Sequence, residues 1–138
     1  MKKGCMTVNL REITALPTLM YWRAEVLRNV LGEAPSPRLL VANRQYYQRH
    51  MSSHMAFVAE ADGVDCGCGA VCFYDELPSP DNPSGRCAYL MNIYVRKEYR
   101  ERGIAHLIVH RLVKEALGKG CGKIYLETTN QGKSRYCH

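Results

Sequence analysis

The sequence predicts a mixed α/β domain, with a central mixed β-sheet and helices on both of its faces. Short runs of residues alternate between apolar and polar with period two, which is typical of strands. One run, residues 87–95, is apolar on both alternations, and a helical pattern and a further strand follow it directly. At 138 residues the chain is most economically a single domain over residues 1–138, which can bury roughly two thirds of its unfolded surface.

The first part of the chain predicts one strand and two helices. Residues 7–14 (TVNLREIT) alternate like a short strand, and a helix follows from about residue 14 or 17 to residue 31, where Gly32 ends it. Ser36 is a good N-cap and Pro37 suits the first helical position, so a second helix is expected to about residue 52.

Three strands are expected next. Residues 54–63 (HMAFVAEADG) and 66–74 (CGCGAVCFY) predict a hairpin. Residues 75–86 contain three prolines and a glycine, so they are expected to form a loop. Residues 87–95 (CAYLMNIYV) are apolar except at Asn92, which indicates a central strand covered on both faces.

The remaining pattern predicts a helix and a strand. Residues 104–117 repeat apolar side chains at helical spacing, and the glycines from 118 to 122 end this helix. Residues 123–129 (KIYLETT) return as a strand. The strand–helix–strand unit over 87–128 should therefore form a right-handed parallel crossover.

The charge of the chain is unevenly distributed. Its net charge is +6, yet residues 1–95 carry nine Lys and Arg against nine Asp and Glu. Residues 96–123 carry eight against three. This concentration of positive charge favours a local anionic partner over general basicity.

The sequence gives no sign of export, membrane insertion or metal binding. No apolar window approaches the roughly 20 residues that cross a bilayer, and a secretory signal is not expected. The seven cysteines are scattered and odd in number, so reduced thiols and a cytoplasmic location are expected, without a membrane partner. A zinc site is not expected, because Cys66 and Cys68 have no second pair of ligands beside them in the sequence. Period two instead places four side chains on one face of a strand: Cys66, Cys68, Cys72 and Tyr74.

The stretch YRERGIAH at residues 99–106 allows two interpretations. It is either an ordinary strand-to-helix turn on the surface or a turn that binds an anion. In the second case the backbone N–H groups and the dipole of the following helix would point at phosphates.

A resemblance to a known family favours the second interpretation. Arg100-x-x-Gly103-x-Ala105, between a strand and an amphipathic helix, resembles the acyl-CoA motif of the GNAT superfamily of N-acetyltransferases. The resemblance covers essentially residues 7–138, and QGKSRY resembles the G-[RK]-x-x-Y segment of one bacterial branch. It implies the acyl-CoA N-acyltransferase fold, in the order β-α-α-β-β-β-α-β-α, apparently without the C-terminal strands that usually follow.

The resemblance also implies an activity and a binding site. The activity is direct transfer of the acetyl group of acetyl-CoA, as co-substrate, to a primary amine of a small molecule or peptide, without a metal. Gly103 would let the backbone approach the pyrophosphate, and the backbone of residues 93 and 95 would pair with the pantetheine arm. The residues that the resemblance assigns to acetyl-CoA are Ile93, Tyr94, Val95, Arg100, Glu101, Arg102, Gly103, Ile104, Ala105, Asn130 and Ser134.

The catalytic assignment is less complete. Tyr136 matches the tyrosine that faces the departing thiolate in this family, and we expect it to hydrogen-bond the sulfur as charge develops. Tyr89 stands where many relatives have a glutamate, so the general base stays open between Asp75, Glu76 and Glu127. The candidates for contact with the acceptor amine are Trp22, Tyr47, Asp75 and Glu76.

Two other functions are alternatives to the enzyme. A non-catalytic CoA or acyl-CoA sensor is favoured by Tyr89 and by the end of the chain at His138. A nucleic-acid-binding module would use the basic segment 96–123, but that segment is not interleaved with a run of stacking aromatic residues, so no nucleic-acid partner is expected. A homodimer is an open alternative.

Overall fold

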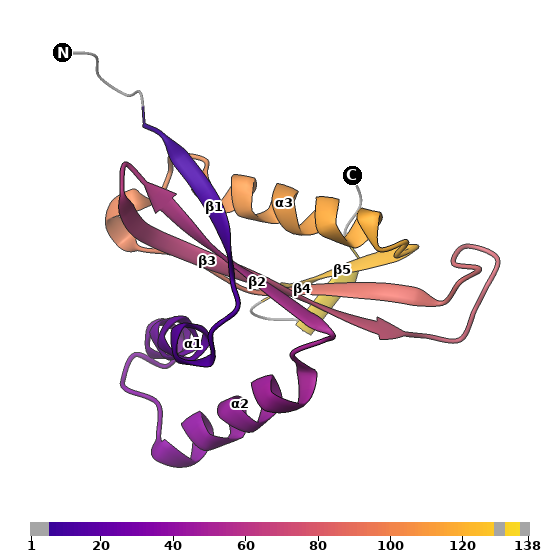
Figure 1. Ribbon diagram of the computed structural model, residues 1–138, viewed down its shortest axis with the longest axis horizontal. Helices are drawn as coiled ribbons and strands as arrows, with labels where there is room; N and C mark the ends of the chain where they lie inside the picture. The colour runs from indigo at the N-terminus through magenta and orange to yellow at the C-terminus, as the bar shows by residue number, and fades with distance from the viewer. Residues whose placement is uncertain (1–5, 129–131, 136–138) are drawn as a thin grey trace.

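The computed structural model describes residues 6–128 and 132–135, which form a mixed six-stranded sheet with helices on both faces (Figure 1). The strands lie in chain order across the sheet, and each neighbouring pair is antiparallel except β4 and β5. This confirms the predicted fold class and the parallel crossover. The strands are β1 (Val8–Ile13), β2 (His54–Ala61), β3 (Val64–Asp75), β4 (Arg86–Val95), β5 (Lys123–Thr128) and β6 (Gly132–Arg135).

The helices begin and end within two residues of the predicted positions. Helices α1 (Leu16–Leu31) and α2 (Pro37–His50) cover one face of the sheet, and α3 (Ile104–Gly118) covers the other (Figure 1). The Ser36 hydroxyl accepts a hydrogen bond from the Leu39 N–H at 3.1 Å, which makes it the N-cap of α2. A short 3₁₀ helix, Lys97–Tyr99, lies between β4 and α3. Among the described residues, none of the helices combines the length and apolarity of a membrane span.

Each face of the sheet has its own apolar core. The core under α3 contains Phe57, Leu90, Ile108 and Leu112, all at most 1% exposed. The core under α1 and α2 contains Leu19, Trp22, Tyr47 and Val58. Alternate residues of β2 therefore contribute to opposite cores, as expected for a central strand covered on both faces.

The cysteine prediction is wrong in one respect: Cys66 and Cys68 lie on opposite faces of the sheet. Cys66 packs in the core under α3, whereas Cys68 packs under α1. The register between β2 and β3 shifts between Ala59 and Glu60, which leaves Cys66 as an extra residue in β3. Such a bulge reverses the faces of the residues before it, so a strict period of two does not hold along this strand.

A second bulge interrupts β4. Cys68 pairs with Tyr94 and Ala70 pairs with Met91, so two residues of β4 stand opposite one residue of β3. One of the two, Asn92, has a left-handed backbone with φ of 59°. Asparagine tolerates this conformation better than most residues do, which explains the polar residue in an apolar strand.

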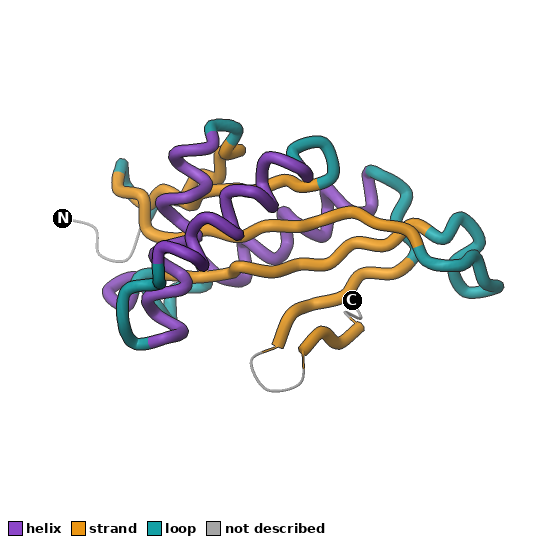
Figure 2. Tube along the Cα trace, turned by 90° about the horizontal axis from the view of Figure 1, so that it is seen from below, coloured by secondary structure: helices purple, strands orange, loops and turns teal. Residues whose placement is uncertain are grey.

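Strands β4 and β5 separate beyond the first half of β4. Their pairing runs from Cys87 opposite Lys123 to Leu90 opposite Leu126. After that, the hairpin of β5 and β6 diverges from the rest of the sheet (Figure 2). Residues 91–95 of β4 thus have no strand partner on that side among the described residues.

One element differs from the expected order. Where the resemblance implies a last helix, the chain forms β6, which pairs antiparallel with β5 from Thr128 opposite Gly132 to Tyr125 opposite Arg135. Gly132 is a poor helix former. The outer edge of β5 also has backbone groups that need hydrogen-bond partners, and β6 supplies them.

We predict that Gly69→Ala destabilises the protein, because a Cβ there would overlap the Cγ2 atom of Ile108 on α3. Overpacking of this kind costs about 1–3 kcal/mol in the free energy of unfolding. A Cβ at Gly118, also on the α3 side, would meet no atom within 4 Å, and Gly118→Ala should stabilise α3 slightly. Urea unfolding of both variants checks this; equal stability of the two would contradict close packing of α3 on β3.

Candidate active site

A cleft lies at the N-terminus of α3. The first intrahelical hydrogen bond is donated by the Leu107 N–H to the Gly103 carbonyl at 3.1 Å. The N–H groups of the three residues before Leu107 have no partner within the helix, and no described side chain caps them. They face a cleft of about 480 Å³, whose other walls come from the end of β4, the turn before α3, and Asn29 of α1.

Two arginines hold the turn that forms this cleft. Arg96 donates to the Glu25 carboxylate at 2.9 Å and to the Tyr21 hydroxyl at 2.7 Å, and its guanidinium lies 4.8 Å from the centre of the Trp22 ring. Arg100 donates to the Val95 carbonyl at 2.8 Å. These contacts tie both ends of the turn to elements that are themselves packed.

The turn also contains two left-handed residues. Gly103 has φ of 81°, and a Cβ there would meet no atom within 4 Å, so the side of Gly103 toward the ligand space is open. Glu101 has φ of 63°, a conformation that costs a non-glycine residue about 1–2 kcal/mol. Its side chain lines the same cleft and brings negative charge to it.

A second cleft of about 320 Å³ continues along the separated half of β4. It lies between α1 and residues 90–93 of β4, with Glu127 of β5 on the remaining side. Ile93 lines both clefts, so they meet at the bulge. The Asn92 N–H points toward β5, where it donates to the Glu127 carboxylate at 3.4 Å.

The backbone of Val95 faces the same way. Arg96 donates its N–H to the Cys66 carbonyl of β3 at 2.8 Å. Because successive residues of a strand direct their backbone groups to opposite sides, those of Val95 point away from β3, toward the clefts. The edge of β4 therefore presents hydrogen-bonding groups along the gap that β5 leaves.

A small inner pocket of about 130 Å³ opens beside the bulge. Arg23 of α1 donates through Nε to the Asn43 side-chain oxygen at 2.8 Å and through one terminal nitrogen to the Asn92 side-chain oxygen at 2.6 Å. Arg23 and Asn92 line both this pocket and the second cleft. The remaining walls come from Asn43, Tyr46, Tyr47, His54 and Met91.

Burial keeps the other titratable groups of the inner pocket uncharged. Burial, and to a smaller extent the nearby His50, lowers the pKa of His54 to about 4, so His54 is neutral at pH 7. Burial likewise raises the pKa of Tyr47 to about 12 and raises the pKa of Tyr46. Arg23 is thus the charged group among the residues that line this pocket.

The structure brings most of the predicted cofactor residues together. Arg102 is the exception among the described ones: its guanidinium lies 5.6 Å from the centre of the Tyr99 ring and approaches the Met6 sulfur, away from the cleft wall. Asn130 and Tyr136 lie outside the described residues, and only the backbone of Ser134, in β6, is described. Those that line the first cleft are Ile93, Tyr94, Val95, Arg100, Glu101, Gly103, Ile104 and Ala105.

Three of the four acceptor candidates lie elsewhere. Trp22 is 3% exposed and packs in the core beneath Arg96. Asp75 pairs in register with Arg86, six residues along β4 from Asn92 and so roughly 20 Å away. Tyr47, in contrast, lines the inner pocket, and its contact with an acceptor stays a prediction.

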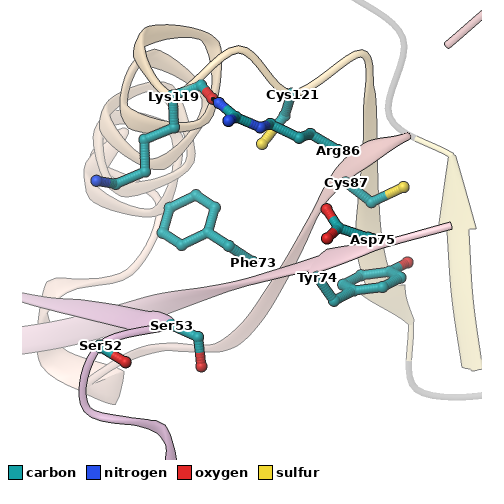
Figure 3. Close-up of a pocket in the computed structure, with 9 residues that line it drawn as sticks. All are labelled: Ser52, Ser53, Phe73, Tyr74, Asp75, Arg86, Cys87, Lys119 and Cys121. Atoms are coloured by element: carbon teal, nitrogen blue, oxygen red, sulfur yellow. Dashed lines mark hydrogen bonds between the residues drawn. The ribbon is translucent and has the colours of Figure 1, made fainter. Parts of the chain in front are cut away.

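The two carboxylates near the far end of β4 lie in other surroundings. Asp75 lines a separate cavity of about 290 Å³ together with Arg86, Lys119 and residues of β3 (Figure 3). Glu76 accepts a hydrogen bond from Tyr125 at 3.1 Å and lies 3.8 Å from the Lys123 ammonium. Of the three base candidates, Glu127 is the one that the fold places in the clefts.

Arg23 and Asn92 were missed as site residues, although the sequence contained a signal for each. Asn92 is the one polar residue in the apolar run 87–95. Arg23 falls between Leu19 and Val26 on the apolar side of α1, where a charge is unusual. Within the described part of the chain, groups of three His, Cys, Asp or Glu arranged to hold a metal ion are absent.

Comparison with known proteins places these features in a family. The model of the acetyltransferase (GNAT) family matches residues 17–136. The thialysine N-ε-acetyltransferase of Sus scrofa is 32% identical over 75 residues, which cover 41% of this chain and 44% of the relative. The chain thus matches less than half the length of this curated relative.

Two solved structures have a similar fold. A predicted acetyltransferase of Clostridium acetobutylicum, solved with acetyl-CoA, has a TM-score of 0.78 at 25% identity and covers 91% of this chain and 84% of its own. A GCN5-related N-acetyltransferase of Ralstonia eutropha has a TM-score of 0.72 at 21% identity, over 90% and 85% of the two chains. The assignment to the bacterial branch through residues 132–136 stays a prediction. The family prediction itself is confirmed: the chain belongs to the acetyltransferase (GNAT) family.

Proposed function

We propose that this protein is an acetyl-CoA-dependent N-acetyltransferase that acts on a primary amine. The observation that carries the proposal is the continuous path from the N-terminus of α3, along the unpaired edge of β4, to the bulge at Asn92. A cofactor with a pyrophosphate at one end and a thioester at the other matches such a path.

The residues present fit acetyl-CoA at both ends of this path. Free N–H groups and the dipole at the start of α3 suit a pyrophosphate, and Gly103 leaves room for it. The Val95 carbonyl already accepts from Arg100, so the amide-bearing pantetheine arm would use the remaining backbone groups of residues 93 and 95 that β5 does not take. The relative from Clostridium acetobutylicum was solved with acetyl-CoA, which supports the same ligand here.

The distribution of charge agrees with an anion at the turn. Arg96, Arg111 and Lys123 lie in the basic segment, and each is within 4 Å of a carboxylate. Arg100 and Arg102 form no ion pair among the described residues, and they flank the turn before Gly103. Lys97, Lys114 and Lys119 of the segment also form no ion pair among the described residues, so the positive side chain available to the proposed phosphate site is that of Arg100, which lines the cleft.

Acetyl-CoA would supply the acetyl group as a thioester, and Asn92 and Glu127 line the second cleft, at the end of the path away from α3. The new C–N bond forms as the C–S bond breaks, the electron pair of that bond leaves with the sulfur, and the amine loses a proton. An alkylamine is only about one part in a thousand neutral at pH 7, which costs roughly 4 kcal/mol. In this structure the Asn92 N–H donates to the Glu127 carboxylate. We assign Glu127 the role of accepting the proton, directly or through water, and the Asn92 N–H, once released from that contact, the role of donating to the developing oxyanion.

We predict that Gly103→Glu weakens acetyl-CoA binding at least about tenfold, because it places a carboxylate where the pyrophosphate would lie. Calorimetric titration of acetyl-CoA measures this. Gly103→Asn is the matched control, since asparagine tolerates the left-handed backbone without adding charge, and it should weaken binding less.

We also predict that Glu101→Gly tightens acetyl-CoA binding, because it removes a negative charge from the cleft. The same change removes a strained residue, so it should raise the free energy of unfolding by about 1 kcal/mol. Unchanged affinity in all three variants would contradict the phosphate site.

We predict that Glu127→Gln lowers kcat about 100-fold at pH 7 while the Kd of acetyl-CoA changes less than about twofold. The deficit should shrink as the pH rises, because a larger fraction of the amine is then already neutral. Steady-state rates from pH 7 to 10 on a panel of primary amines measure this. Glu33→Gln, at an exposed position before α2, is the control for loss of one carboxylate. A kcat equal to that of the unmodified protein would remove Glu127 from the mechanism.

For Tyr136 we keep the proposed hydrogen bond to the leaving sulfur. Tyr136→Phe should lower kcat by about tenfold or more and leave the Kd of acetyl-CoA nearly unchanged, since the bond strengthens only as charge develops. Single-turnover rates beside calorimetry separate the two quantities. Loss of binding without loss of kcat would give Tyr136 a role in holding the cofactor instead.

A further inference from the structure

Arg23 lies in the candidate site without an ionic partner among the described side chains. The guanidinium is half-buried between α1, α2 and the bulge of β4 and makes two hydrogen bonds, both to neutral amide oxygens. Three of its five N–H donors have no partner among the described residues. Within residues 6–127, carboxylates within 4.0 Å of Arg23 are absent, although four other cationic side chains there have one.

Arg96 shows how the same fold treats a comparable arginine. Like Arg23, it is half-buried on the α1 side of the sheet, and it forms an ion pair with Glu25 at 2.9 Å. A partly desolvated charge normally has such a partner, because desolvation without one is costly. The two asparagines at Arg23 hold the guanidinium in place but do not neutralise it.

The positive charge of Arg23 faces space that a ligand can reach. Arg23 lines both the inner pocket and the second cleft, and the other inner-pocket side chains are neutral at pH 7. Glu127 lies on the opposite side of Asn92, whose side chain contacts Arg23 and whose N–H contacts Glu127. The two charges of opposite sign therefore flank the bulge without contacting each other.

We infer that the acceptor is a small amine that carries a carboxylate, and that Arg23 binds this carboxylate while the amine lies toward Glu127. The inference rests on the proposed N-acetyltransferase function and names its substrate class. An arginine with terminal N–H donors to spare matches the two oxygens of a carboxylate. Polyamines and other acceptors with several positive charges would place a second cation against Arg23, which disfavours them.

The test compares acids with their amides. Glycine, β-alanine and 4-aminobutyrate, each beside its uncharged amide, are offered to the unmodified protein, Arg23→Gln and Arg23→Lys. We expect Arg23→Gln to lower kcat/KM for the preferred acid about 10- to 100-fold and for its amide less than about twofold. Arg23→Lys should recover part of the loss, because it keeps the charge. The ratio of acid to amide cancels intrinsic differences in amine reactivity and any general loss of structure.

Arg28→Gln is the matched control. It removes the same charge from the same helix at an exposed position whose side chain forms no hydrogen bond among the described residues, so the ratio should not change. The inference is overturned if the unmodified protein shows no preference for acids, or if Arg23→Gln lowers acid and amide rates equally. It is also overturned if Arg23→Gln loses acetyl-CoA binding instead, because Arg23 would then belong to the cofactor site.

A binding measurement separates this inference from the proposed function. The N-acetylated acids and amides are titrated into the protein saturated with CoA, with no turnover required. Tighter binding of the acids that Arg23→Gln removes supports a carboxylate site even if no amine is acetylated, in which case only the proposed function fails. Equal binding of acids and amides overturns the carboxylate site even if transfer to amines is observed.

Discussion

The separation of β4 from β5 at the bulge is the feature on which the rest of the site depends. A continuous ladder would have hydrogen-bonded the backbone of residues 91–95 to β5 and filled the gap that forms both clefts. Asn92 marks the change, because its left-handed backbone turns its N–H toward β5 and its side chain toward α1. This one residue, two positions beyond the last β4–β5 pair at Leu90, therefore contacts both of the charged groups that line the second cleft.

The turn before α3 depends on packing that lies outside the cleft. Arg96 joins the turn to α1 through Glu25, Tyr21 and the Trp22 ring, and Arg100 spans it to the Val95 carbonyl. With both ends of the turn held, Glu101 keeps a left-handed conformation that would otherwise relax. Arg100 thus has a structural role in holding the turn, in addition to its proposed role as a phosphate contact. Trp22 is buried and contributes to the site indirectly, because its ring packs against the Arg96 guanidinium.

Electrostatics distinguishes the proposed cofactor end of the site from the proposed acceptor end. At the proposed cofactor end, helix N–H groups and Arg100 supply positive potential, which Glu101 partly offsets. At the acceptor end a fixed arginine and a carboxylate stand on the two sides of Asn92 in a pocket whose histidine and tyrosines stay neutral. A zwitterionic acceptor matches this pair of charges, and the fold holds both on elements packed against a core, which keeps their spacing constant.

Local patterns in the sequence predicted the helices, five of the six described strands and the family, through the spacing of apolar residues, the caps at Ser36 and Gly32, and the motif from Arg100 to Ala105. The phosphate site that the same motif predicts stays a proposal. Asn92 is also visible in the sequence as the polar residue of an apolar strand, whereas Arg23 was missed. Which polar residues share a site depends on the tertiary structure. The bulges at Cys66 and Asn92 arise from strand register, which reverses faces and is not visible in a strict alternation. For the same reason, Asp75 and Glu127 were equal candidates in the sequence. Asp75 and Glu127 lie in different parts of the structure because of the register in which each strand pairs with its neighbours. This register depends on contacts between residues far apart in the chain, which local residue patterns do not contain.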